Sequence, residues 1–319
     1  MKSKHRPHKS KRDHHAPDKR RQDDGPRRVV GVLQKASNGW RLQSANRKES
    51  GEYILHAKTN VELIQGQLAV AEIVTKQRHG YGPKECKLIE VLGDTDAPKA
   101  VSLIAIATHD IPHNFDKAAI QEANDAKPVT LDGRDDLRKI PLVTIDGEDA
   151  RDFDDAVFAE PDGEGWHLMV AIADVAHYVK AGSALDKDAY ERGNSVYFPD
   201  RVVPMLPEAL SNELCSLKPH VERACMAAHL WLDKAGELTR WKFVRGVMKS
   251  HARLTYEQAQ HAIDGRTDTV TAPLVDKVIE PLYAAYKCLM QARLNRGTLE
   301  LDLPERKVII SDDGKVQAI

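Results

Sequence analysis

Hydrophobic positions change their spacing along the chain, and the spacing predicts two kinds of structure. From Val29 to Leu92, short runs rich in β-branched and aromatic residues alternate with turn residues such as Ser37-Asn38-Gly39. These runs predict five strands, at 29–33, 40–43, 53–56, 67–75 and 86–92. Five short strands in about 65 residues favour a small closed β-barrel of the OB type over residues 29–93.

Two segments flank the predicted barrel. Residues 1–28 carry 11 Lys or Arg, 4 Asp and almost no apolar side chains, so they predict a disordered basic arm. Such an arm either binds phosphates or only keeps the chain soluble. Residues 94–127 predict a connector with a short helix at Asp116–Ala126, and Lys127-Pro128 marks the start of a second domain.

The second domain, residues 128–319, mixes strands and helices without an internal repeat, which predicts an α+β fold. An apolar run at Trp166–Ala173 predicts a buried strand. The pattern Thr255-x-x-Gln258 predicts a capped helix over Tyr256–Ile263. Apolar residues predict a longer helix that is kinked at Pro281 and ends at Gly297; they are Leu274, Val278, Leu282, Leu289 and Leu294.

Composition limits the class of protein. The chain has 319 residues, of which 41% are hydrophobic, which suits two domains and excludes a wholly disordered chain. No apolar run is long enough to cross a membrane, and no apolar stretch follows the basic N-terminus as in a secretory signal. The four cysteines form no C-x-x-C pair, which argues against a zinc site or a disulfide scaffold and favours buried apolar side chains. We expect a soluble protein of the cytoplasm.

The net charge of −1 hides an acidic window at residues 130–164, which hold 12 acidic and 4 basic side chains. Within it, the segment TIDGEDARDFDDAV places four aspartates in ten residues, namely Asp146, Asp152, Asp154 and Asp155. Carboxylates this close raise one another's pKa unless a cation neutralises them. Ligands that are all oxygen select Mg²⁺ or Mn²⁺, and two such ions can stabilise the attacking and leaving oxygens of a phosphoryl displacement. The segment therefore predicts a metal-dependent phosphoryl-transfer site.

Three other interpretations of the aspartates fit less well. An EF-hand loop counted from Asp152 would have Ala156 at a ligand position and Val157 at the glycine position. An aspartyl-nucleophile phosphatase would have Thr where Ala156 stands. A solvated acidic loop would not need the apolar residues between the acids, such as Phe153 and Phe158.

The predicted barrel carries aromatic and basic residues of the kind that bind single-stranded nucleic acid. The aromatic candidates are Trp40, Tyr53 and Tyr81, and the basic candidates are Lys35, Arg41, Arg47 and Lys48. The alternative for Trp40 and Tyr53 is that both rings belong to the barrel core. Spacing alone leaves this alternative open.

Several long motifs occur in one order and resemble the RNase II/RNase R family of exoribonucleases, RNase R above all, with its catalytic RNB domain. The resemblance covers about Val29–Ile319. Besides the aspartate segment, the motifs are EVLGD at 90–94, HDIPHNF at 109–115, AIADVAHYV at 171–179, RGNSVYFPDRVVPMLPEALSNELCSL at 192–217 and RGTLELDLPERKV at 296–308. The first two motifs are similar to the end of a cold-shock domain and its connector, so the OB barrel is expected to be cold-shock-like.

The resemblance implies a processive 3′→5′ exoribonuclease that threads single-stranded RNA into a channel and releases nucleoside 5′-monophosphates with Mg²⁺, for which Mn²⁺ can substitute. The family's catalytic, metal-binding aspartates correspond to Asp146, Asp152, Asp154 and Asp155, and Asp154 is expected to be the least dispensable. Tyr197 in SVYFP matches the aromatic residue that stacks on the 3′-terminal base.

The sequence also departs from the family pattern. It shows one barrel and no S1 barrel, and Leu301 stands where a second clamping aromatic often occurs. It stops at Ile319, inside the expected catalytic domain and before the arginine-rich segment of the family. We therefore expect a truncated RNB domain that is inactive alone and poorly soluble, because the missing part would leave apolar surface exposed.

Two functions of other classes compete with the exonuclease. In the first, the protein is a catalytically inert RNA-binding protein that uses the barrel and the basic arm. In the second, the chain pairs with a separately encoded C-terminal half.

Overall fold

The structure is a computed structural model, and the part of the chain that it describes falls into two compact units, Met1–Ala100 and Val101–Ile319. The described residues are 28–45, 51–57, 62–74, 84–94, 100–299, 301, 308–311 and 316–319. The basic arm predicted at 1–28 lies, except for Arg28, outside the described residues.

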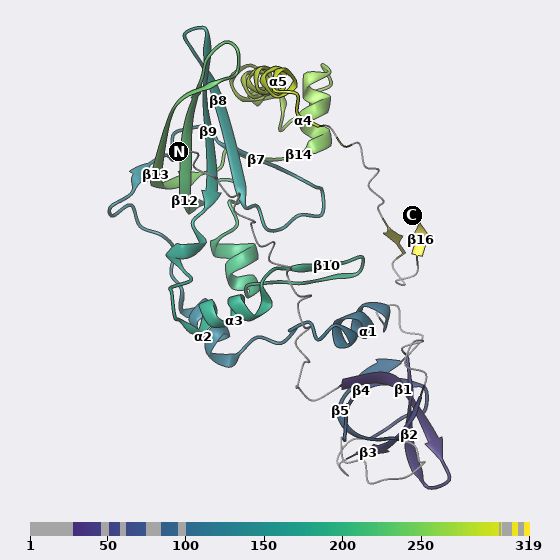
Figure 1. The fold of residues 1–319 in the computed structure, drawn as a ribbon. Coiled ribbons are helices and arrows are strands. Elements are labelled where there is room, and N and C mark those ends of the chain that lie inside the picture. The colour runs from purple at the N-terminus through teal and green to yellow at the C-terminus, as the bar shows by residue number, and fades with distance from the viewer. Residues whose placement is uncertain are drawn as a thin grey trace, which may run out of the picture. The chain divides into compact units, whose positions relative to one another are not determined.

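The first unit is a closed five-stranded barrel, as the sequence predicts (Figure 1). Its strands are β1 (Arg28–Ala36), β2 (Gly39–Ser44), β3 (Glu52–His56), β4 (Gln67–Ile73) and β5 (Lys84–Asp94). Their order around the barrel is β1-β2-β3-β5-β4, and β4 pairs with β1 to close it. All neighbours are antiparallel except β3 and β5, which are parallel. Alternate side chains point inward, where Leu33, Leu42 and Cys86 are fully buried.

The second unit is built on a seven-stranded sheet of order β14-β7-β8-β9-β12-β13-β6. Its strands are β6 (Asp135–Asp136), β7 (Val143–Asp146), β8 (Asp155–Asp162), β9 (Gly165–Ala173), β12 (Glu222–Leu232), β13 (Leu238–Lys249) and β14 (Ala252–Thr255). The two edge strands β14 and β6 run parallel to their neighbours, and the inner pairs are antiparallel. Two small hairpins complete the strands: β10 (Val196–Phe198) with β11 (Arg201–Val203), and β15 (Ile309–Ile310) with β16 (Val316–Ala318).

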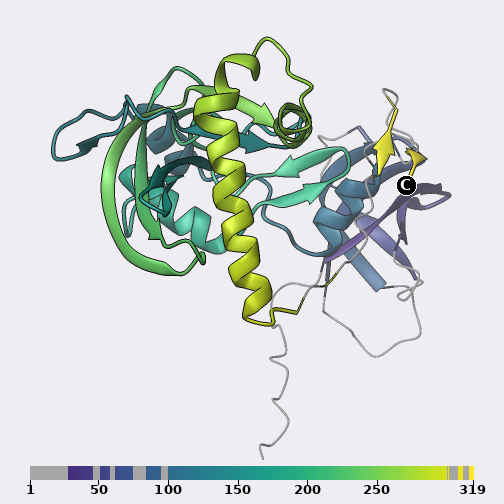
Figure 2. The same ribbon diagram turned by 90° about the horizontal axis from the view of Figure 1, so that it is seen from above.

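Helices cover parts of both faces of this sheet. They are α2 (Lys117–Asp125), α3 (Ala184–Arg192), α4 (Tyr256–Ile263) and α5 (Glu280–Asn295). A further helix, α1 (Ala100–Thr108), precedes them in the chain. Short helical turns are η2 (Val175–His177), η3 (Ala209–Leu214), η4 (Ala272–Leu274) and η5 (Val275–Ile279), of which η3 and η5 are π-helical. Figure 2 shows the long helix α5 running across the sheet from above.

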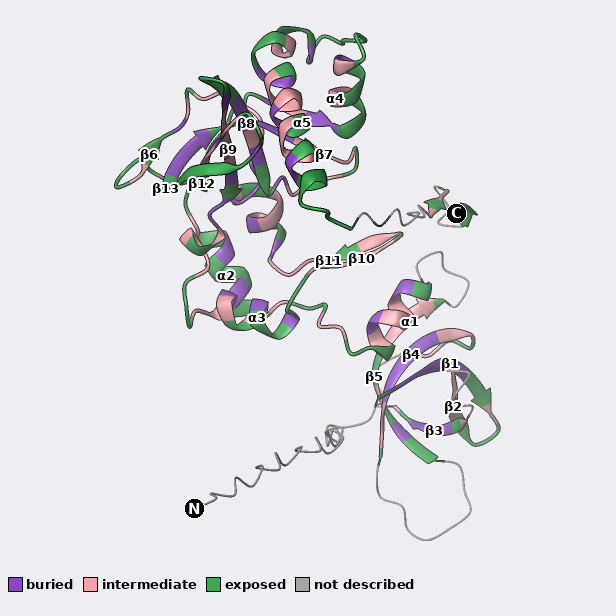
Figure 3. Ribbon diagram, turned by 45° about the horizontal axis from the view of Figure 1, so that its top comes forward, coloured by how far each residue is buried: buried purple, intermediate pink, exposed green. Residues whose placement is uncertain are grey.

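The sheet has a hydrophobic core on each side. On one face, Phe158 and Met169 pack with Ala119 of α2, Leu185 of α3 and Leu210 of η3. On the other face, strands β7 and β14 pack against α4 and η5. The buried stretches follow the inner strands in Figure 3, so the sheet is the rigid element that carries the loops between its strands.

Most local predictions for the second unit are confirmed. Strand β9 covers Trp166–Ala173, and α4 begins with the predicted capping box, in which Thr255 and Gln258 each accept a backbone N–H of the other. The cysteines are free, and burial raises the pKa of Cys86, Cys215 and Cys225 to about 12.

Two predictions need correction. The predicted helix is not one continuous α-helix, because α5 begins only at Glu280, with Pro281 in its first turn. The segment before it is the π-helical turn η5. The helix predicted at Asp116–Ala126 is present, but it belongs to the second unit rather than to a connector that ends at Lys127, because Ala119 and Ala123 are buried in the core of that unit.

Gly165 at the start of β9 is expected to tolerate no side chain. A Cβ at this position would overlap the carbonyl oxygen of Leu232 in the neighbouring strand β12. We therefore expect Gly165→Ala to lower the free energy of unfolding by about 1–3 kcal/mol, measured by urea denaturation. Gly147→Ala is the matched control, since no heavy atom lies within 4 Å of a Cβ there. Equal stability of both variants would contradict the close approach of the strands.

Candidate active site

The four aspartates lie on one loop between two neighbouring strands of the sheet. Asp146 is the last residue of β7, and Asp155 is the first residue of β8. Because β7 and β8 are antiparallel neighbours, the end of one and the start of the other meet at the same edge. Asp152 and Asp154 lie on the connection, and the amide of Ala173 in β9 donates to the carbonyl oxygen of Asp154 at 2.8 Å.

An arginine from the next strand holds the first half of this loop. Arg253 lies on β14, beside β7, and its Nη2 donates to the carbonyl oxygens of Gly147 at 2.8 Å and Glu148 at 2.6 Å. Its guanidinium also lies 5.6 Å from the centre of the Phe153 ring. One cation therefore orients the peptide groups that follow Asp146.

The aspartates interact with one another electrostatically. Burial raises the pKa of Asp154, and the charges of Asp152, Asp155 and Asp146 raise it further. Burial and the charge of Asp146 likewise raise the pKa of Asp155. Negative charge on Asp154 and Asp155 is thus disfavoured in the absence of a cation.

Tyr197 reaches the same loop from the hairpin β10–β11. Its hydroxyl donates to Oδ2 of Asp152 at 3.3 Å, while the residue as a whole remains 66% exposed. Burial of the hydroxyl and the nearby charge of Asp152 raise the pKa of Tyr197. The structure therefore brings together the acidic segment and an exposed aromatic ring 45 residues away in sequence.

The hairpin that carries Tyr197 makes contacts with other residues both at its turn and at its base. Ser102 of α1 donates a short hydrogen bond to Asp200 in the hairpin turn, and Ser195 accepts the backbone N–H of Met205 at 3.0 Å. At its base, the buried Arg192 lies 3.7 Å from the centre of the Phe115 ring and donates to the carbonyl oxygen of Pro112 at 2.7 Å. These contacts restrict where the Tyr197 ring can lie.

The donor set can be tested against a divalent cation. Four carboxylates without His or Cys are the ligand type of a hard cation such as Mg²⁺, and their mutual repulsion is what such a cation relieves. Within the part of the chain that the structure describes, no three His, Cys, Asp or Glu side chains are already gathered as a ligand set. The residues therefore fit the ion by their chemistry, although they are not arranged around it.

The barrel residues singled out from the sequence have different surroundings. Tyr53 is 3% exposed and belongs to the barrel core, so its ring cannot stack on a base; the core alternative is correct for this residue. Trp40 is half-buried against the same core. Lys35 is exposed, and Arg41 pairs with Glu52 at 2.5 Å. The other candidates, Arg47, Lys48 and Tyr81, lie outside the described residues.

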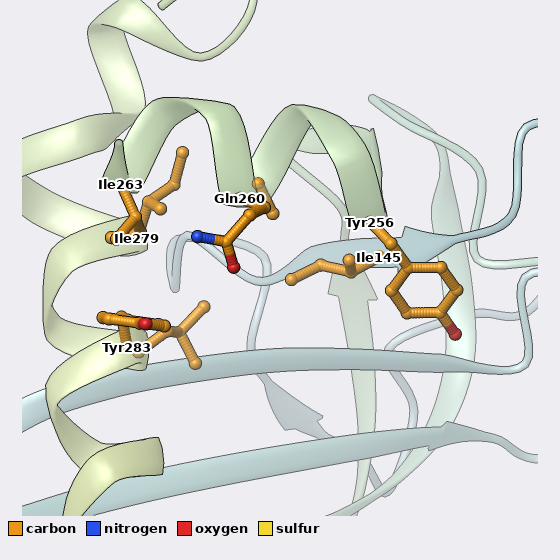
Figure 4. Close-up of a pocket in the computed structure, with 8 residues that line it drawn as sticks. Ile145, Tyr256, Gln260, Ile263, Ile279 and Tyr283 are labelled. Carbon is orange, nitrogen blue, oxygen red and sulfur yellow. The ribbon is translucent and has the colours of Figure 1, made fainter. Parts of the chain in front are cut away.

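A small apolar cavity lies next to Asp146, between β7, α4 and α5. Figure 4 shows Ile145 and Tyr256 at one end, Ile263 and Tyr283 at the other, and Gln260 between them. Apart from Gln260 its walls are aliphatic and tyrosine side chains, and none of the four aspartates lines it. It is therefore separate from the acidic loop.

Comparison with known proteins agrees with this geometry. A model of the RNB domain matches residues 134–319, and a model of the cold shock domain matches residues 43–116. The chain belongs to the RNB family. The sequence analysis assigned no role to Arg253 or Ser216, which both lie inside this RNB match. Ser216 stands in the motif at 192–217, but the sequence does not show its role, because the partners of both residues are distant in sequence.

Relatives of this RNB protein include ribonuclease R of Vibrio parahaemolyticus, 46% identical over 80% of this chain, and that of Escherichia coli, 47% identical over 73% of it. These alignments cover 31% and 29% of the two relatives, so the chain spans about a third of their length. Mycoplasma genitalium RNase R, solved in complex with double-stranded RNA, superposes with a TM-score of 0.79 at 25% identity, over 90% of this chain and 51% of that one. No helix among the described residues has the length and apolar character needed to cross a membrane.

Proposed function

We propose that this chain is the cold-shock and leading RNB portion of an RNase R-like enzyme that degrades single-stranded RNA processively from the 3′ end in the cytoplasm. The observation that carries the proposal is the hydrogen bond between Tyr197 and Asp152, because it joins an exposed aromatic ring to an acidic loop. An aromatic ring can hold a terminal base of any identity, and the acidic loop can hold the metal beside its phosphate. Similarity to ribonuclease R over most of the chain supports the proposal.

In this proposal Asp146, Asp152, Asp154 and Asp155 hold Mg²⁺, or Mn²⁺ in its place. A bound divalent ion supplies positive charge to the scissile phosphate and acidifies the attacking water. Arg253 keeps the peptide groups after Asp146 in place, and the exposed ring of Tyr197 stacks on the 3′-terminal base.

On the barrel, Lys35 and Trp40 are the described residues that remain candidates for RNA contact. Lys35 lies directly opposite Trp40 in the β1–β2 pair, so a phosphate and a base of one strand could meet both side chains. Arg41 contributes less, because Glu52 neutralises its charge.

The proposal is tested by incubating a 5′-labelled single-stranded RNA with this chain and with the same chain extended to the length of its relatives, with Mg²⁺ or with EDTA. Release of mononucleotides and a short labelled end product, only with Mg²⁺, supports the exonuclease. If neither form cleaves the RNA but both retard it in a gel, the protein is an inert RNA-binding protein. Activity restored only by a separate C-terminal half supports two-chain assembly.

Tyr197→Ala is expected to weaken substrate binding strongly. Stacking of a base on an aromatic ring contributes about 1–3 kcal/mol, so the KM for single-stranded RNA should rise roughly tenfold to hundredfold in the extended chain. Tyr197→Phe keeps the ring, removes only the hydrogen bond to Asp152, and should retain most of the affinity. Equal KM values for the Ala variant and the unmodified protein would rule out stacking at this position.

A further inference from the structure

The second half of the aspartate loop is held by a single buried serine. The hydroxyl of Ser216 accepts the backbone N–H of Phe153 at 3.1 Å and donates to the carbonyl oxygen of Arg151 at 2.9 Å. These two peptide groups flank Asp152 on both sides. One hydroxyl thus fixes the backbone before and after a single acidic side chain.

The backbone next to Ser216 extends this contact. The amide of Leu217 donates to the carbonyl oxygen of Phe153 at 2.8 Å, so residues 216–217 pair with 151–153 over three hydrogen bonds. Leu217 and Ser216 have no exposed surface. The bond between Ser216 and Phe153 is therefore buried, where hydrogen bonds are shielded from water, and the bond to Arg151 is partly buried.

The backbone of Ser216 is in turn hydrogen-bonded to a buried arginine. Nε of Arg223, at the start of β12, donates to the carbonyl oxygen of Ser216 at 2.9 Å, and Arg223 is buried. This bond connects the loop, through Ser216, to the sheet. Asp152 is then supported by a rigid strand rather than by the loop alone.

We propose that Ser216 is a positioning residue for the active site, which keeps Asp152 in place for the divalent cation and for the hydroxyl of Tyr197. Ser216 touches neither the substrate nor the cation, and acts through the peptide groups of Arg151 and Phe153. This proposal rests on the proposed function, because it assigns to Ser216 the task of supporting the cation site of the same reaction. To the residues of that site it adds Ser216, a buried residue that lies 64 positions after Asp152 in the sequence.

Removing the hydroxyl should loosen the loop without removing any acidic group. In Ser216→Ala, the N–H of Phe153 and the carbonyl of Arg151 lose their partner, and the N–H of Phe153 is buried, where its hydrogen bond is costly to lose. Loss of a group that supports a metal ligand typically weakens metal binding by about 10–100-fold. We expect about a tenfold rise in the Mn²⁺ concentration at half-saturation.

The test measures Mn²⁺ binding to the 319-residue chain by the electron paramagnetic resonance signal of the free ion. Amide hydrogen exchange of residues 150–155 is measured in parallel. The matched control is Ser250→Ala, since Ser250 is equally buried and its hydroxyl donates to the carbonyl of Ala252 at 3.0 Å, away from Asp152. The expected result is weaker Mn²⁺ binding and faster exchange in Ser216→Ala only, with both melting temperatures compared to exclude global unfolding.

The outcomes separate this proposal from the proposed function. If Ser216→Ala binds Mn²⁺ as tightly as the unmodified chain, or if Ser250→Ala weakens binding equally, Ser216 is no positioning residue. If the unmodified chain and Asp146→Asn both bind no Mn²⁺, the proposed cation site fails. In that case amide exchange still tests the role of Ser216. Faster exchange at residues 150–155 in Ser216→Ala supports the proposal that Ser216 positions the loop, and unchanged exchange overturns that proposal.

Discussion

Asp154→Asn should abolish Mg²⁺-dependent release of mononucleotides from single-stranded RNA, lowering kcat about a hundredfold or more in the chain extended to the length of its relatives. Desolvation and the charges of Asp152, Asp155 and Asp146 all raise the pKa of Asp154. The amide keeps the shape of the side chain but cannot supply the negative charge that a hard cation requires. Single-turnover assays with a 5′-labelled RNA measure this loss directly.

The same substitution should not destabilise the protein in the absence of metal. The raised pKa of Asp154 means that its ionised form is disfavoured in the folded state, so the neutral amide removes repulsion. We expect the melting temperature in EDTA to stay equal or rise slightly. Asp162→Asn, an exposed position at the far end of β8, is the matched control for activity. Unchanged hydrolysis by Asp154→Asn would leave the inert RNA-binding protein as the better interpretation.

Arg134→Met is expected to have the largest effect on stability. Nη2 of Arg134 lies 2.7 Å from Oδ2 of Asp174, and both side chains are almost fully buried. Without the arginine, the carboxylate of Asp174 stays buried and loses its close partner. Breaking a buried pair in this way typically costs about 3–5 kcal/mol, which urea denaturation would show as a lower free energy of unfolding.

Two further variants test this explanation. Arg245 also faces Asp174, but at 3.8 Å and from a largely exposed side chain, so Arg245→Met should cost no more than about 1 kcal/mol. Combining Arg134→Met with Asp174→Asn removes the unpaired charge and should recover part of the lost stability. If Arg134→Met alone costs as little as Arg245→Met, the buried pair is not what stabilises this part of the sheet.

Local patterns in the sequence were sufficient to predict the barrel and, in the RNB domain, one strand of the sheet and one capped helix. The five barrel strands, the strand at 166–173 and the capped helix at 256–263 all depend on neighbours within a few residues. Alternation of apolar side chains, turn residues and the pair Thr255 and Gln258 act at that range. The set of aspartates was predictable for the same reason, because all four lie within ten residues.

Contacts between distant parts of the chain decided the rest. Whether Tyr53 lies in the core or on the surface depends on which face of β3 closes the barrel, and the ring turned inward. Pro281 lies in the first turn of α5, because the residues before it form the π-helical turn η5.

The candidate active site also combines features set by the local sequence with features set by contacts between distant residues. The sequence by itself determined which acidic residues are available, since their spacing is local. Only the tertiary structure decided what holds them: Ser216 reaches Phe153 across 63 residues, and Arg253 reaches Gly147 across 106. A hydrogen bond depends on the positions of two atoms in space, and residues so far apart come together only when the whole sheet has formed.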